Sequence, residues 1–160
     1  MATEKLKFKL ELYATMWDKA PNCRVFINDI CKWEGEVRGT EKAPDIIEFD
    51  NECEEGENYK LIIDRGGKGK TQTVINEKGD ILKDQLLHIK SIEIDEILIG
   101  ALIYEGVYTP QYPEPWATQQ REKGVRLEES LKNVTQMGHN GSWTLKFTSP
   151  FYLWLLENLY

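Results

Sequence analysis

The sequence has few of the residues on which catalysis and metal binding usually depend. Its 160 residues include only two histidines, His88 and His139, and three cysteines, Cys23, Cys31 and Cys53. Two histidines that are far apart in the chain give little support for a histidine-based metal site or a histidine-assisted nucleophile. Three cysteines with no close pair indicate reduced thiols in a protein made in a cytoplasm, in preference to disulfides or a metal site.

Positive charge and long apolar runs are also scarce. The chain has 27 acidic and 20 basic residues, which gives a formal net charge of −7. Nucleic acids and anionic membranes attract basic surfaces, so we expect neither among the partners. No apolar run approaches the ~18 residues needed to span a bilayer, and the first residues lack the apolar core of a signal peptide.

Long stretches with a 3.6-residue apolar stripe are absent too, whereas alternation with a period of two is frequent. In residues 5–13 the apolar side chains Leu6, Phe8, Leu10 and Leu12 alternate with charged ones. This pattern is typical of a strand with one buried face. Further strands are expected at residues 23–27, 30–37, 46–49, 59–64, 71–75, 86–94, 97–104 and 143–148, the run at 97–104 being apolar on both faces and therefore central.

Short strands separated by turns predict a mostly β protein. We expect a jelly-roll-like antiparallel β-sandwich with one or two short helices near the C-terminus. Residues 1–160 then form a single domain, in which residues 105–160 are an arm and a C-terminal segment that pack on neighbours. Asn28 and Asp29 lie between two strand candidates and predict a tight turn.

One motif resembles a nucleotide site without meeting its requirements. Gly69, Lys70 and Thr71 resemble the end of a phosphate-binding loop. That loop also needs a glycine five residues earlier, where this chain has Asp64, and a helix directly afterwards, where the pattern is β-like. A hairpin loop is the better interpretation.

Acidic residues are plentiful, and two groups of them raise the question of calcium. Residues 45–57 hold seven acidic side chains, but their spacing is not that of an EF-hand, which favours a solvated acidic segment. Asp80, Asp84 and Asp95 flank the expected strand at residues 86–94. Loops converge at the ends of a sandwich, so these three are candidate cation ligands, with ordinary turn residues as the alternative.

Aromatic residues gather in a proline-rich segment. Tyr104, Tyr108, Tyr112 and Trp116 occur within thirteen residues that also contain three prolines. Proline excludes a regular helix or central strand there and presents rings at a low entropic cost. A sugar-stacking platform, a protein interface and a loop with buried rings all fit this segment.

The C-terminus is apolar on nearly every side. Ser149 and Pro150 form a helix start, followed by Phe151, Tyr152 and Trp154 in an almost continuous apolar run. A final strand is the competing interpretation. Such a segment must dock either on its own core or on a neighbouring molecule.

Several stretches resemble known families. Residues 24–30, 55–63, 70–74 and 80–95 resemble calcium-dependent, xylan-binding-type carbohydrate-binding modules. The run at 84–95, the Tyr/Pro segment at 108–116 and the end at 150–155 are together still more similar to small virion proteins of tailed phages that carry this kind of sandwich.

This resemblance implies a non-catalytic structural protein of a phage particle, made in the host cytoplasm, such as a capsid decoration, tail or fibre-associated protein. Its partners would be other virion proteins and copies of itself. The aromatic residues of the Tyr/Pro segment and of the C-terminus would form the contacts. The alternative is a calcium-assisted carbohydrate-binding module or adhesin, with Asp80, Asp84 and Asp95 as the cation candidates.

Overall fold

The computed structural model is a two-layer antiparallel β-sandwich, as the alternating sequence pattern predicts; it describes residues 2–17, 19–68, 74–78 and 80–159. The first sheet has the strand order β12–β8–β1–β4, with the short β9 paired to β8. Its strands are β1 (Thr3–Thr15), β4 (Asp45–Glu54), β8 (Leu86–Ile94), β9 (Ile97–Leu98) and β12 (Gln136–Met137).

The second sheet has the order β11–β10–β13–β5–β2–β3, and every strand pair is antiparallel. Its strands are β2 (Asn22–Ile27), β3 (Ile30–Glu36), β5 (Asn58–Gly66), β10 (Val107–Pro110), β11 (Leu131–Lys132) and β13 (Gly141–Thr148). A separate hairpin is formed by β6 (Val74–Ile75) and β7 (Ile81–Lys83), and the helices are η1 (Gly100–Glu105), α1 (Trp116–Glu122) and α2 (Phe151–Leu159).

The core lies between the two sheets and is built by the alternation of their strands. On β1 the side chains of Leu6, Phe8, Leu10 and Leu12 are at most 1% exposed. They face buried residues of the second sheet, among which Trp143 is completely buried. Each such side chain contributes about 1.5–3 kcal/mol of burial, so this interior accounts for most of the stability.

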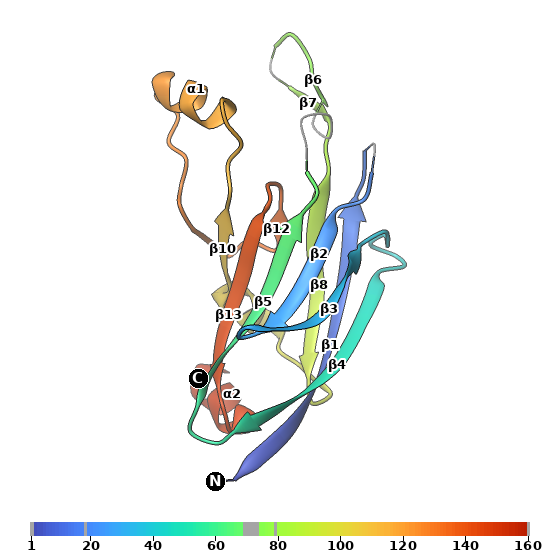
Figure 1. The fold of residues 1–160 in the computed structure, drawn as a ribbon, viewed down its shortest axis with the longest axis vertical. Coiled ribbons are helices and arrows are strands. Elements are labelled where there is room, and N and C mark those ends of the chain that lie inside the picture. Colours follow the sequence, from blue (N-terminus) through green and yellow to red (C-terminus); the bar gives the residue numbers. More distant parts are fainter. Residues whose placement is uncertain (1, 18, 69–73, 79, 160) are drawn as a thin grey trace.

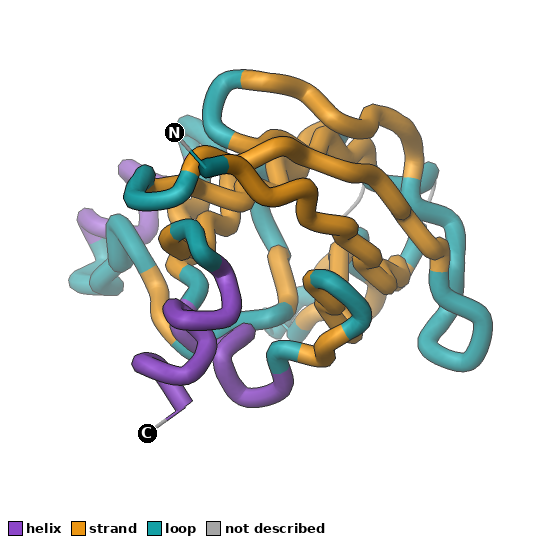
Figure 2. The backbone as a smooth tube through the Cα atoms, turned by 90° about the horizontal axis from the view of Figure 1, so that it is seen from below, coloured by secondary structure: helices purple, strands orange, loops and turns teal. Residues whose placement is uncertain are grey.

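The two ends of the sandwich differ. The β6–β7 hairpin and α1 both project beyond one end, while α2 and the N-terminus lie at the other (Figure 1). Viewed from the α2 end, the strands of both sheets surround the interior, and the helix that leads to the C-terminus lies at the edge (Figure 2). In the described part of the chain, no helix is long and apolar enough to cross a membrane.

Local turn chemistry agrees with the predicted turn at residues 28–29. Asn28 has φ = 53°, a left-handed conformation that asparagine tolerates, and Ile27 pairs directly with Ile30 across the hairpin. Register shifts mark irregularities on β1, between Glu11 and Leu12, and on β2, between Val25 and Phe26.

Two expectations about the elements were wrong or incomplete. Residues 97–104 are not a central strand: after the two residues of β9, Ile99 leaves the extended conformation with φ −74° and ψ −12°, and Gly100, with φ 55°, begins η1. An apolar run without alternation cannot distinguish a buried strand from a buried helix turn. Of the expected strand at 71–75, only β6 lies within the described residues.

The segment 105–160 is more than an arm. Its strand β13 is placed between β10 and β5 and supplies core residues, including Trp143. The part that projects is the connection between β10 and β11, which carries α1 (Figure 1). At Gly106, before β10, an added Cβ would lie 2.1 Å from the Trp143 ring, so only glycine fits this approach.

Candidate functional site

The C-terminal helix α2 is attached firmly to the sandwich. The carboxylate of Glu4, on β1, accepts hydrogen bonds from the backbone N–H of Phe151 at 2.7 Å and from the hydroxyl of Ser149. A carboxylate at a helix N-terminus accepts hydrogen bonds from N–H groups that have no partner within the helix. Its negative charge also interacts favourably with the positive end of the helix dipole. Ser149 is therefore not the cap that the sequence predicted, because the capping carboxylate comes from the opposite end of the chain.

The two faces of α2 are both apolar, but only one of them is buried. Phe151, Trp154 and Leu155 are 2%, 8% and 5% exposed, and they pack on the core around Phe147. The opposite face remains in solvent. Its residues are Tyr152, Leu153, Leu156 and Leu159, which are 43–60% exposed. Of the three predicted interface residues here, Tyr152 lies on the exposed face, whereas Phe151 and Trp154 belong to the core.

The Tyr/Pro segment, like α2, has both buried and exposed aromatic residues. Tyr108, on β10, is only 2% exposed, and its hydroxyl accepts a hydrogen bond of 2.9 Å from the His139 N–H and donates one to the His139 carbonyl. Burial raises the pKa of Tyr108 to about 12. Tyr108 therefore fixes the turn before β13 and is not available to a partner.

Tyr112 and Trp116 form a ring cluster with His139. The centre of the Tyr112 ring lies 5.1 Å from that of His139 and 6.2 Å from that of Trp116. The centres of the Trp116 and His139 rings are 5.5 Å apart. Trp116 is 38% exposed, while burial and the nearby Lys68 charge lower the pKa of His139. Tyr104, at the end of η1, is 48% exposed and does not belong to this cluster.

Beneath this cluster lies a buried polar network. The guanidinium of Arg65, which is 1% exposed, donates to the Gln85 carbonyl at 2.6 Å, to Gln85 Oε1 at 2.7 Å and to Asn140 Oδ1 at 3.2 Å. Next to it, the ammonium of Lys68 binds Asp84 at 2.7 Å and also donates to the Gly138 carbonyl. The network ties the end of β5 to the start of β8 and to the turn before β13.

The three cation candidates are not brought together. Asp84 is held by Lys68 before β8, and Asp95 accepts the Lys7 N–H at 2.9 Å beyond the far end of the same strand. Asp80 lies in the β6–β7 hairpin, where its carboxylate accepts a hydrogen bond of 3.2 Å from Asn76. Within the described ranges, no group of three or more His, Cys, Asp or Glu residues could hold a metal ion. Among the described residues, Asp80, Asp84 and Asp95 therefore do not form one cation site.

The acidic run at 45–57 has a structural explanation. Glu48, Asp50 and Glu52, on the edge strand β4, lie directly opposite Lys9, Lys7 and Lys5 of β1. Opposite charges paired across neighbouring strands stabilise a sheet, and charge on an edge strand discourages unwanted strand pairing. The nucleotide-like motif at 69–71 lies outside the described residues, but Asp64 is a strand residue of β5 that pairs with Arg24 at 2.6 Å.

Two further features could not be predicted from the sequence, because they bring together residues that are far apart in the chain. Lys60 of β5 and Lys146 of β13 lie opposite each other beside a cavity that Trp154 of α2 also lines. At the other end, the ammonium of Lys83 lies 3.5 Å from the centre of the Trp17 ring, near exposed Ile81 and Leu82 of β7.

Comparison with known proteins supports the β-sandwich fold. No family model matches the sequence, and no curated protein matches it significantly. The structure is similar to that of vCBM60, solved in a study of two families of calcium-dependent carbohydrate-binding modules linked by circular permutation, with a TM-score of 0.50. The sequences are 7% identical, and the match covers 87% of this chain and 88% of the other. The fold is therefore a β-sandwich similar to that of this module. The virion setting is not tested by these comparisons and stays a prediction.

Proposed function

We propose that this chain is a non-catalytic structural protein that assembles with other protein subunits, and with copies of itself in particular, through the exposed face of α2. The observation that carries the proposal is the exposure of Tyr152, Leu153, Leu156 and Leu159 on one side of a single helix. Contiguous apolar surface of this kind is typical of interaction sites on folded proteins. The sequence resemblance supplies the setting, a phage particle.

The attachment of α2 supports this role. The helix is held by Glu4 at its N-terminus and by Trp154 and Leu155 in the core, so its outer face is presented without a folding step. A preformed face costs less conformational entropy on binding than a flexible tail does. The spacing of residues 152, 156 and 159 places three large side chains along one stripe of the helix.

The chemistry of the face suits contact between two copies. A twofold contact brings the same patch of each copy together, so the patch must complement itself. The four exposed apolar side chains carry no charge. Glu157 is also exposed on this helix, but it lies outside the stripe of residues 152, 156 and 159, so two such stripes can meet without opposing like charges, although the whole chain has a net charge of −7.

Sedimentation velocity over a range of protein concentrations tests this proposal. We expect the wild-type chain to self-associate and Leu156→Glu to be monomeric, because a charge would then be buried in the contact. Leu98→Glu is the matched control, since Leu98 is also exposed (60%) but lies on β9. A wild-type chain that stays monomeric at every concentration, or equal loss of association in both variants, would refute the proposal.

A second function, glycan binding, is favoured by the ring cluster of Tyr112, Trp116 and His139 at the other end of the sandwich. Exposed aromatic rings stack on the apolar faces of sugars, and the fold is one that carbohydrate-binding modules also have. In this alternative the α1 connection would be an adhesive surface.

Affinity electrophoresis in gels containing neutral polysaccharides tests the glycan function. Retardation that is lost in Trp116→Ala but kept in Trp17→Ala would support it, since both tryptophans are 38% exposed. Because the described acidic residues do not form a calcium site, we expect retardation to be unchanged by a chelator. Absence of retardation in all gels would count against this candidate.

A further inference from the structure

A cavity of about 440 Å³ lies between the β2–β3 turn, the adjoining ends of β5 and β13, and α2. Its lining includes side chains of several chemical kinds, namely Asn28, Asn58, Lys60, Lys146, Thr148 and Trp154. The volume is within the range of ~300–1,000 Å³ that is usual for sites that bind small ligands. Neither the ring cluster nor the exposed face of α2 belongs to it.

The two lysines are arranged unlike the other strand lysines. Lys60 and Lys146 lie directly opposite each other on β5 and β13, and like charges in this arrangement destabilise a sheet. In the described part of the chain neither ammonium takes part in an ion pair or hydrogen bond. The same is true of Lys7 and Lys132, so it is the direct opposition across two strands that sets Lys60 and Lys146 apart. Two adjacent unpaired cations at a cavity attract an anionic group.

The remaining polar groups of the cavity suit hydroxyl groups. The amide of Asn58 and the hydroxyl of Thr148 make no side-chain hydrogen bond among the described residues, and they lie opposite each other two residues along the same strands. Asn28 Oδ1 accepts the Lys60 N–H at 2.9 Å, which leaves the Asn28 NH₂ group for another acceptor. Trp154 adds an aromatic side chain from α2.

We propose that this cavity binds a carboxylate-bearing sugar, such as a uronic acid residue of a polysaccharide. The carboxylate lies between the ammonium groups of Lys60 and Lys146, where charge-assisted hydrogen bonds are strongest. The sugar hydroxyls pair with Asn58, Thr148 and the Asn28 amide. Trp154, which is only 8% exposed, closes one wall of the cavity. An acidic peptide would use the two lysines but would leave the amide and hydroxyl groups unexplained.

The proposal goes beyond the assembly role and depends on other side chains. Affinity electrophoresis against polygalacturonate, with neutral galactan as the uncharged comparison, tests it. We expect polygalacturonate alone to retard the wild-type chain, and the apparent affinity to fall at least tenfold in Lys60→Gln/Lys146→Gln. Removal of two opposed like charges should leave the thermal unfolding temperature unchanged or raised, so the variant remains folded.

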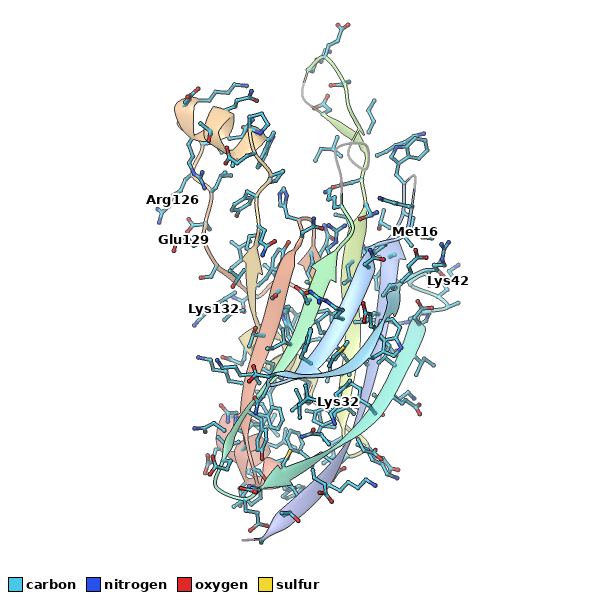
Figure 3. All side chains as sticks on the ribbon, viewed as in Figure 1. Met16, Lys32, Lys42, Arg126, Glu129 and Lys132 are labelled. Carbon is cyan, nitrogen blue, oxygen red and sulfur yellow. The ribbon has the colours of Figure 1, made fainter. Side chains whose placement is uncertain are left out.

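Lys132→Gln is the charge-matched control. Lys132 is exposed on β11 of the same sheet, beside the connection that carries α1 and away from α2 (Figure 3). Its substitution should leave the retardation unchanged.

Three results would overturn the proposal: no retardation by polygalacturonate, equal retardation of the double variant and the wild type, or equally tight binding to poly-L-glutamate. The last result would assign the cavity to acidic peptides. Sedimentation of the double variant should match that of the wild type, so failure here is distinguishable from failure of the assembly role.

Discussion

The carboxylate of Glu4 on β1 accepts a 2.7 Å hydrogen bond from the backbone N–H of Phe151, the first residue of α2. This contact joins the two ends of the chain and orients the helix on which the proposed assembly role depends. It also explains why the helix begins here: the carboxylate satisfies an N–H group that the helix itself cannot satisfy.

Glu4→Ala should therefore loosen α2. We expect the free energy of unfolding to fall by about 1–2 kcal/mol, because a charged cap and its hydrogen bonds are lost. Urea denaturation monitored by tryptophan fluorescence measures this change. Glu55→Ala, which removes the same charge from an exposed turn, should have little effect, and equal losses in the two variants would contradict a capping role for Glu4.

Arg65→Met should be among the most destabilising single changes outside the apolar core. It leaves the Gln85 carbonyl and Gln85 Oε1 without their buried donor and removes one of the two donors to Asn140 Oδ1, and we expect a loss of about 3 kcal/mol. Arg24→Met provides the comparison, because Arg24 is exposed on the neighbouring strand, where it pairs with Asp64 and lies over the Phe26 ring. We expect Arg24→Met to lower the free energy of unfolding by much less, as measured by the same urea denaturation.

The two histidines predict a loss of stability in mild acid. Burial lowers the pKa of His88, against a smaller opposing effect of Glu41; burial and then Lys68 lower the pKa of His139, which Asp84 partly offsets. The unfolded chain, whose histidine pKa is about 6.5, therefore binds more protons than the folded chain just below that pH, and stability falls as the pH decreases through this window.

Urea denaturation of the wild type and of His88→Gln/His139→Gln at pH 7.5 and pH 5.5 tests whether the histidines cause this loss of stability. The difference in unfolding free energy between the two pH values should be smaller in the double variant. An unchanged difference would mean that neither histidine is linked to folding.

The three thiols should differ in reactivity. Cys31 is exposed, whereas Cys23 and Cys53 are buried, and burial raises the pKa of Cys23 to about 12 and that of Cys53 from its ordinary value. Because the thiolate is the reactive form, Ellman's reagent should titrate one thiol in the native protein and three in urea. Rapid reaction of a second thiol in the native state would contradict the packing of β2 or β4.

Much of the sandwich could be predicted from the sequence because its strands alternate. In β1 the positions of Leu6, Phe8, Leu10 and Leu12 decide both the element and its buried face. The run at 97–104 has no alternation, and the strand stops where Ile99 takes helical backbone angles and Gly100 a left-handed one.

The candidate sites were harder to predict, since they depend on residues far apart in the chain. The sequence indicated that the C-terminus is apolar, but it could not tell Tyr152, which is exposed, from Trp154, which is buried. The opposition of Lys60 and Lys146 follows from the register of β5 and β13, and no local pattern encodes it. Asp84 and Asp95 flank β8 as predicted, but they lie at its opposite ends and are held by different partners, Lys68 and the Lys7 N–H.

Chemical cross-linking at the exposed face of α2 tests the central claim most directly. Leu156→Cys and Leu98→Cys, each in a Cys31→Ser background, would be treated with a short bis-maleimide at a concentration where the wild type associates. The account predicts covalent pairs of chains for the cysteine at 156 and essentially none for the cysteine at 98. Equal cross-linking at the two positions, or none at 156 in an associated sample, would contradict assembly through α2.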